Sequence, residues 1–205
     1  MRRVPQILTC LALLFLALPA WAVRPEPSVA IFPGKGSIQV AFAPWDDAEA
    51  LLNETIASAR RQILVQAFLL TSRTFAFSLI DAKGRGVNVQ VLADSRQHAD
   101  TPGSLLGLLL QHGIPVWLET RYRNAHNKIV VIDADEPVNR FGAGDGPTVI
   151  SGSYNFTWGA QRMNAENLIV IRDHPALAQR FAKNWRRHQQ QATPLQTLSR
   201  GDIEP

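Results

Sequence analysis

Hydrophobic and polar positions follow two different periods along this chain, and their alternation predicts an α/β domain. Apolar residues recur at every second position in some segments, as in β-strands, and at helical spacing in others. Up to residue 118, strand-like and helix-like segments alternate. We predict strands at 37–42, 63–68, 87–92 and 114–118, and helices that begin near Asp46, run from Thr71 or Ser72 to Gly84, and cover 104–111.

After residue 125 the rhythm changes. Segments 128–132, 148–151 and 167–171 are strand-like with little helix between them, and a last helix is predicted over about 175–190. Strands that alternate with helices favour an α/β sheet with helices on both faces. We predict a leader at 23–36 that is extended and rich in proline and glycine, one domain at 37–191, and a flexible C-terminal tail at 192–205.

The first 22 residues are typical of a secretory signal peptide. Arg2 and Arg3 form a short positive segment, residues 7–18 are almost entirely apolar, and Ala22 completes an A-x-A cleavage site. The apolar run is shorter than the about 20 residues of a membrane-spanning helix. We therefore expect cleavage after Ala22 and a periplasmic or secreted mature protein. The alternative is an uncleaved membrane anchor.

Cleavage changes both charge and redox chemistry. The full chain has 21 Lys+Arg and 17 Asp+Glu, so loss of Arg2 and Arg3 reduces the net charge from +4 to +2. This is weak support for a polyanionic partner. Cys10, the only cysteine, is removed with the signal. The mature chain therefore forms no internal disulfide, and a packed core must stabilise it.

The candidate chemistry lies between His126 and Asp133. This stretch reads H-x-K-x-x-x-x-D, and in a strand His126 and Lys128 point to the same face. Cleavage of a phosphodiester needs a nucleophile, positive charge near the phosphoryl oxygens and a proton for the leaving alkoxide. Histidine suits the first role and lysine the second. We interpret Asp133 as structural, anchoring the loop through hydrogen bonds.

Further polar side chains follow in Gly152-Ser153-Tyr154-Asn155-Phe156-Thr157. The Ser153 hydroxyl and the Asn155 amide can donate hydrogen bonds to phosphate, although both residue types are also common in turns. The sequence shows no His/Asp cluster with metal-ligand spacing, and Lys128 would repel a cation. We therefore expect no metal and no cofactor.

Three motifs together resemble the phospholipase D superfamily, in particular the small secreted bacterial endonucleases of Nuc type. They are H-N-K-I-V-V-I-D (126–133), G-S-Y-N-F-T (152–157) and N-A-E-N (164–167), within a likeness that runs from about residue 40 to 185. The resemblance implies a mixed sheet sandwiched between helices and metal-independent cleavage through a phosphohistidine. It also implies a single active site for each pair of motifs.

The resemblance also implies residue roles. His126, Lys128 and Glu166 would be catalytic, with Glu166 holding the imidazole of His126 in one tautomer. Lys128, Ser153 and Asn155 would bind the substrate phosphate, and Asp133 and Gly152 would be structural.

The chain carries the H-x-K motif once, and this predicts a homodimer. An attacking imidazole cannot also protonate the leaving group in the same step, so a second histidine is needed. A two-fold dimer would bring His126 and Lys128 of both subunits to one site on the symmetry axis.

We expect a non-specific endonuclease that cleaves DNA, with RNA left open as a second substrate. One alternative is a phospholipase D that hydrolyses phospholipid headgroups, and a second is a catalytically silent module that binds nucleic acid or phosphate. An insertion at 135–146, with Arg140 and Phe141, is expected close to the active site.

Other residues receive structural interpretations. Asp94 is expected to cap a turn or helix, and core packing is the default for the aromatic residues, although they could stack bases. We expect the remaining histidines to be surface residues. The aromatic residues are Tyr122, Phe156 and Trp158, and the histidines are His98, His112, His174 and His188.

Overall fold

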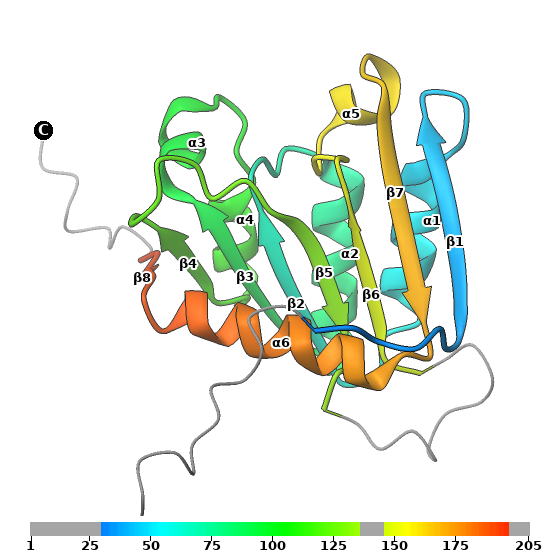
Figure 1. The fold of residues 1–205 in the computed structure, drawn as a ribbon. Helices are drawn as coiled ribbons and strands as arrows, with labels where there is room; N and C mark the ends of the chain where they lie inside the picture. Colours follow the sequence, from blue (N-terminus) through cyan, green and yellow to red (C-terminus); the bar gives the residue numbers. More distant parts are fainter. Residues whose placement is uncertain (1–29, 136–145, 197–205) are drawn as a thin grey trace, which may run out of the picture. The chain divides into compact units, whose positions relative to one another are not determined.

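The structure is a computed structural model that describes residues 30–135 and 146–196 (Figure 1). Residues 1–32 form a unit separate from residues 33–205, and the second unit is described below. The expected signal peptide and its cleavage site lie outside the described residues. No helix within 30–135 or 146–196 is both long and apolar enough to cross a membrane.

The described residues form one eight-stranded mixed sheet, which confirms the predicted fold class. Its order is β1-β7-β6-β5-β2-β3-β4-β8. Strands β2, β3 and β4 are parallel to one another, and every other neighbouring pair is antiparallel. The strands are β1 (Ser37–Ala43), β2 (Gln62–Ala67), β3 (Asn88–Asp94), β4 (Val116–Glu119), β5 (Lys128–Ile132), β6 (Thr148–Gly152), β7 (Glu166–Arg172) and β8 (Thr193–Pro194).

Helices cover both faces of this sheet. Helix α6 lies in front of it in Figure 1, while α1, α2 and α4 lie behind it. The helices are α1 (Ala48–Ala57), α2 (Arg73–Gly84), α3 (Ser95–Asp100), α4 (Leu106–Gln111), α5 (Trp158–Arg162) and α6 (Pro175–Gln189). The sheet thus separates two apolar cores, a larger one beneath α1, α2 and α4 and a smaller one beneath α6.

Local sequence explains where the predicted helices begin. The Asp47 side chain accepts a hydrogen bond from the Ala50 amide at 2.9 Å, and the Ser72 hydroxyl accepts one from Phe75 at 3.2 Å. Each side chain satisfies an amide that has no partner within its helix. Helix α2 ends two residues before Gly86, whose φ of 90° suits glycine.

Three short elements were not predicted, namely α3, α5 and β8. The two helices have six and five residues, too few for a helical period to show in the sequence. Strand β8 falls within the predicted tail, where Thr193 pairs with Leu118 of β4. The tail from residue 197 onward lies outside the described residues.

The strand directions bring the motif residues to one end of the sheet, which we call the site end. Strands β2, β3, β4 and β6 finish there, and β5 and β7 begin there. The terminal residues concerned are Ala67, Asp94, Glu119, Gly152, Lys128 and Glu166.

The residues on either side of the insertion at 135–146 lie at the other end of the sheet. The prediction that the insertion lies close to the active site is therefore wrong for these flanking residues. Strand β5 runs away from the site, and the chain therefore enters the insertion at the opposite end of the sheet. There Asp135 pairs with Arg186, and the Gly146 amide donates to Asp173 at 2.8 Å. Arg140 and Phe141 lie outside the described residues.

Candidate active site

Lys128 is the first residue of β5, His126 lies two residues before the strand, and the two side chains differ in exposure. The His126 side chain is exposed, whereas Lys128 is only 6% exposed. The Lys128 ammonium lies 3.0 Å from Nδ1 of His126 and donates to the His126 carbonyl at 3.1 Å. An exposed imidazole above a buried cation can approach a phosphate that the cation holds.

Phe68, which the sequence did not single out, packs against both His126 and Lys128. It follows β2 directly, and the pairing of Ala67 with Lys128 brings it beneath the motif. The Phe68 ring centre lies 4.3 Å from that of His126 and 4.7 Å from the Lys128 ammonium. The cation therefore sits over an aromatic face, where attraction to the ring partly replaces lost hydration.

Burial changes the acid–base behaviour of Lys128. Desolvation lowers the pKa of Lys128 to about 8, and the negative charge of Glu166 counteracts part of this shift. A lysine with this pKa is largely protonated at neutral pH and loses its charge in mildly alkaline solution. Its ability to hold a phosphate is therefore tied to pH.

Gly152 allows β6 to approach β7 closely at the site end. Its φ is 148°, and a Cβ atom here would lie 2.2 Å from the backbone oxygen of Asn167. That same oxygen accepts hydrogen bonds from the amides of Ser153 and Tyr154, at 3.1 and 3.2 Å. Ser153 is exposed, and its hydroxyl accepts a 3.0 Å bond from the Asn167 amide. The structure thus ties this loop to β7.

Asn155 lies in the part of the loop that returns toward β2. The Phe156 amide donates to Leu69 at 3.2 Å, and Phe156 is buried against Phe75 with ring centres 4.4 Å apart. Oδ1 of Asn155 is buried and has no hydrogen-bond partner among the described residues. A buried acceptor without a partner is costly. A phosphate would be bound by the NH2 group of the same side chain, because phosphate oxygens and Oδ1 are all acceptors.

Glu166 begins β7 at the site end but is not paired with His126. Its Oε1 accepts a hydrogen bond from Asn164 at 3.0 Å, and its charge reaches Lys128. Among the described residues, the group that faces Nδ1 of His126 is the Lys128 ammonium. The predicted orienting contact between Glu166 and His126 is therefore not formed in this structure.

Asp133 closes the far end of β5. Its Oδ1 accepts hydrogen bonds from the amides of Arg61 and Gln62 at 2.9 and 2.8 Å, and its Oδ2 accepts one from Arg60 at 2.9 Å. Asp133 is buried with φ of 53°. The three bonds connect the end of β5 to the turn that enters β2.

Several other side chains differ from their predicted settings. His174 is buried at the start of α6, and His188 is half-buried against Glu119, so neither is a surface residue. Asp94 caps α3 as predicted, but it also binds Ala125. Tyr122 and Trp158 are exposed rather than packed in the core: Tyr122 lies in the loop between β4 and β5, and Trp158 is the first residue of α5.

Among the described residues, no three His, Cys, Asp or Glu side chains come together in a group that could hold a metal ion.

Comparisons with known proteins agree on one family. Residues 52–189 match a family described as "Cardiolipin synthase, PLD-like domain". A phospholipase D of Rickettsia bellii is 32% identical over 151 residues, 74% of this chain and 68% of its own length. A mitochondrial cardiolipin hydrolase of Xenopus laevis is 28% identical over 166 residues, 80% and 72% of the two lengths. The solved structure of Nuc from Salmonella typhimurium, a phospholipase D family member, aligns with a TM-score of 0.70 at 29% identity. It covers 78% of this chain and 99% of Nuc.

Proposed function

Because this chain belongs to the phospholipase D superfamily of phosphodiester-cleaving hydrolases, we propose that it is a metal-independent endonuclease of low sequence specificity. One observation carries the proposal: exposed His126 lies 3.0 Å from the buried ammonium of Lys128 at the site end. Asn155 lies in the loop at the same end of the sheet, where the NH2 group of its side chain can donate to a phosphate oxygen. Secretion or export to the periplasm is proposed from the signal-like sequence of residues 1–22, which lie outside the described residues.

In the proposed reaction, a nitrogen of His126 attacks phosphorus as one P–O bond breaks. Lys128, Asn155 and Ser153 hold the phosphoryl oxygens, and water later hydrolyses the phosphohistidine. A bound phosphate would attract the Lys128 ammonium away from Nδ1 of His126. Glu166 would then accept a hydrogen bond from the N–H at that position and hold the tautomer that attacks.

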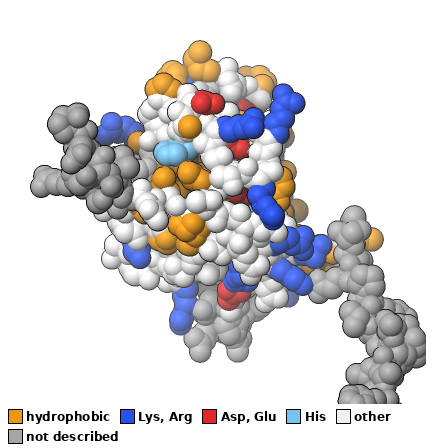
Figure 2. Space-filling model, turned by 90° about the vertical axis from the view of Figure 1, so that its left-hand side faces the viewer, with side chains coloured by type: hydrophobic (Ala, Val, Ile, Leu, Met, Phe, Trp, Pro, Cys, Tyr) orange, Lys and Arg blue, Asp and Glu red, His pale blue; other side chains and the backbone are white. Residues whose placement is uncertain are grey.

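The charge around the site supports a nucleic acid as substrate. Five exposed arginines lie in segments that connect strands at the site end, where they could follow a phosphate backbone. They are Arg73, Arg96, Arg121, Arg123 and Arg162. Figure 2 shows Lys and Arg side chains gathered along the right-hand margin of one face. Exposed Tyr122 and Trp158 could stack bases.

We also propose that two copies of the chain complete one site. The attacking imidazole needs a second histidine, as imidazolium, to give its proton to the leaving alkoxide and later to take one from water. An apolar sheet face supports such pairing. Ile38, Val40 and Phe42 of β1 are 67%, 47% and 53% exposed, on the side of the sheet that α6 covers over β5 and β6. Exposed apolar patches of this kind mark interfaces.

The dimer is tested with mixed subunits. Co-expressed wild type and His126→Ala chains, isolated as heterodimers, should have almost no activity, and normal activity would exclude a shared site. Phe42→Glu should shift the protein toward monomers in sedimentation, whereas Phe77→Glu, at a 45% exposed position on the outer face of α2, serves as the matched control. Loss of the dimer in both variants would argue against the β1 face.

The second candidate function is phospholipid hydrolysis, which the names of the relatives from Rickettsia bellii and Xenopus laevis favour. One assay separates the two. Purified mature protein in excess EDTA is offered plasmid DNA, RNA, an aryl phosphodiester, and vesicles of phosphatidylcholine or cardiolipin. Cleavage of DNA supports the endonuclease, and turnover of lipid alone supports the phospholipase. Loss of all activity in EDTA would contradict the metal-independent mechanism.

A further inference from the structure

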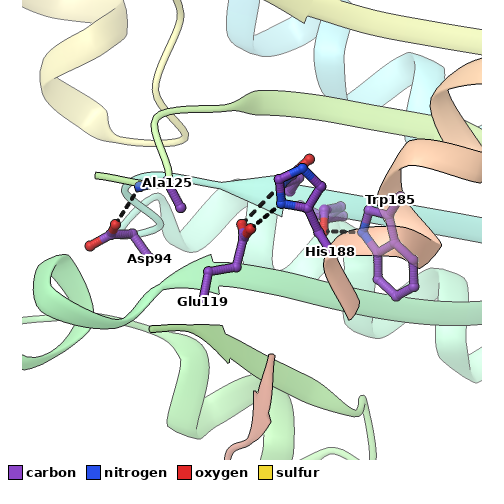
Figure 3. Close-up of polar contacts among 7 residues, drawn as sticks. Asp94, Glu119, Ala125, Trp185 and His188 are labelled. Atoms are coloured by element: carbon purple, nitrogen blue, oxygen red, sulfur yellow. Dashed lines mark hydrogen bonds and ion pairs between the residues drawn. The ribbon is translucent and has the colours of Figure 1, made fainter. Parts of the chain in front are cut away.

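Two buried carboxylates lie beneath the segment that leads into His126, outside the reaction scheme above. Asp94 ends β3 and is 1% exposed, and Glu119 ends β4 and is 3% exposed. Figure 3 shows both at the ends of neighbouring strands, each directed at a different partner. Because burying a carboxylate is costly unless its oxygens accept hydrogen bonds, their partners reveal what they hold in place.

Asp94 divides its two oxygens between a helix and the approach to the nucleophile. Its Oδ1 accepts a 2.8 Å hydrogen bond from Gln97 and caps α3, while its Oδ2 accepts a 2.6 Å bond from the amide of Ala125. Ala125 is itself buried and immediately precedes His126. A short bond to a charged acceptor is strong, so it ties the backbone before the nucleophile to the end of β3.

Glu119 holds the beginning of the same segment. Its Oε1 lies 2.5 Å from Nδ1 of His188, in the last turn of α6, and its Oε2 accepts a 2.9 Å bond from buried Gln66 of β2. The ring of His188 packs against that of Tyr122, with centres 5.3 Å apart. Helix α6 is in turn fixed to β2, because Trp185 donates to the Val65 carbonyl at 2.8 Å (Figure 3).

We propose that Asp94 is a positioning residue that sets the angle from which His126 attacks, with the Glu119–His188 pair supporting the other end of segment 120–125. The inference rests on the proposed function of His126. The His126 side chain is exposed and contacts only part of its surroundings, Phe68 and Lys128, so the position of its backbone contributes to its orientation. A misplacement of about 1 Å at a reacting atom can lower a rate about 100-fold. Neither carboxylate needs to touch the substrate.

Asp94→Ser separates this role from helix capping. Serine caps helices well, but its shorter side chain cannot reach Ala125. With an aryl phosphodiester, we expect kcat to fall about 10- to 100-fold. KM should stay within about two-fold, because the phosphate-binding groups are unchanged. Asp94→Asn keeps one acceptor oxygen, so its kcat should lie between those of Asp94→Ser and the wild type. It provides the same test if Asp94→Ser does not fold.

The control is Asp47→Ser, the same change at the cap of α1. It should leave kcat unchanged. Wild-type kcat in folded Asp94→Ser, or an equal loss in both serine variants, would overturn the positioning role while leaving the proposed function intact. A wild-type protein without phosphodiesterase activity would overturn both.

Discussion

The two ends of β5 treat their polar groups in opposite ways. At the Asp133 end, a buried carboxylate receives hydrogen bonds from three successive backbone amides. At the other end, Lys128 is buried with a lowered pKa, His126 is exposed, and the nearby loop holds the unpaired Oδ1 of Asn155. At the Asp133 end the polar groups find their partners within the chain, whereas at the other end His126 and Lys128 are placed so that they can bind a ligand. Substitutions at the two ends of β5 should therefore have different effects, on activity at the His126 end and on stability at the Asp133 end.

The largest expected effect is on activity at the site end. His126→Ala should lower phosphodiesterase kcat by about 10³-fold or more, since it removes the nucleophile. Its free energy of unfolding should change by no more than about 0.5 kcal/mol, because the side chain is exposed. Steady-state kinetics and urea denaturation measure the two. Residual activity above a tenth of wild type would assign the nucleophile elsewhere.

The opposite result is expected at the far end. Asp133→Ala leaves three backbone amides without their acceptor, and we expect a loss of about 3 kcal/mol in the free energy of unfolding. Asp135→Ala is the matched control, because its ion pair with Arg186 is largely exposed and contributes less than about 1 kcal/mol. Similar denaturation midpoints for the two variants would remove the contrast between the ends of β5.

The buried ammonium of Lys128 should make activity at the site end depend on pH. In the wild type, kcat/KM should decrease about tenfold per pH unit above about 8, because the free enzyme then loses the ammonium. Lys128→Arg, whose guanidinium stays charged, should lack this alkaline decrease even if its activity is lower. An unchanged alkaline limb in this variant would assign the titration to another group.

The same residue should cost stability at neutral pH. The folded-state pKa of Lys128 lies below its unfolded value of 10.5, so the unfolded chain binds more protons between about pH 8 and 10.5. Wild-type stability therefore gains across that window. Lys128→Met should have a higher melting temperature than wild type at pH 7, and the difference should shrink as the pH rises from 8 to 10.5. A lower melting temperature at pH 7 would contradict this.

The smallest effect concerns the support that α6 gives to the site end. His188→Leu removes the donor to Oε1 of Glu119, and we expect a loss of about 1 kcal/mol in unfolding free energy with a few-fold lower kcat. His188→Asn retains a donor near the position of Nδ1 and should recover most of both. Equal unfolding free energies and equal kcat values for the two variants would show that the hydrogen bond between residue 188 and Glu119 is unimportant.

Hydrophobic periodicity alone located the long elements, because each is long enough to show its period and several carry capping residues such as Ser72. The mixed sheet and the role of Glu166 came from the motif resemblance, whereas His126 and Lys128 were also predicted from the chemistry of their side chains. Sequence could not reveal Phe68 or the second bond of Asp94, because strand pairing and loop closure create those contacts between distant segments.

The sequence by itself predicted the type of chemistry, since a histidine two residues before a lysine supplies a nucleophile beside a positive charge. Only the tertiary structure decided which end of the sheet holds the site and which holds the insertion, because that depends on the direction of β5 relative to β2. It also decided that Lys128 is buried and His126 exposed. Desolvation, and with it the lowered pKa of Lys128, is a property of the packed fold that no local pattern encodes.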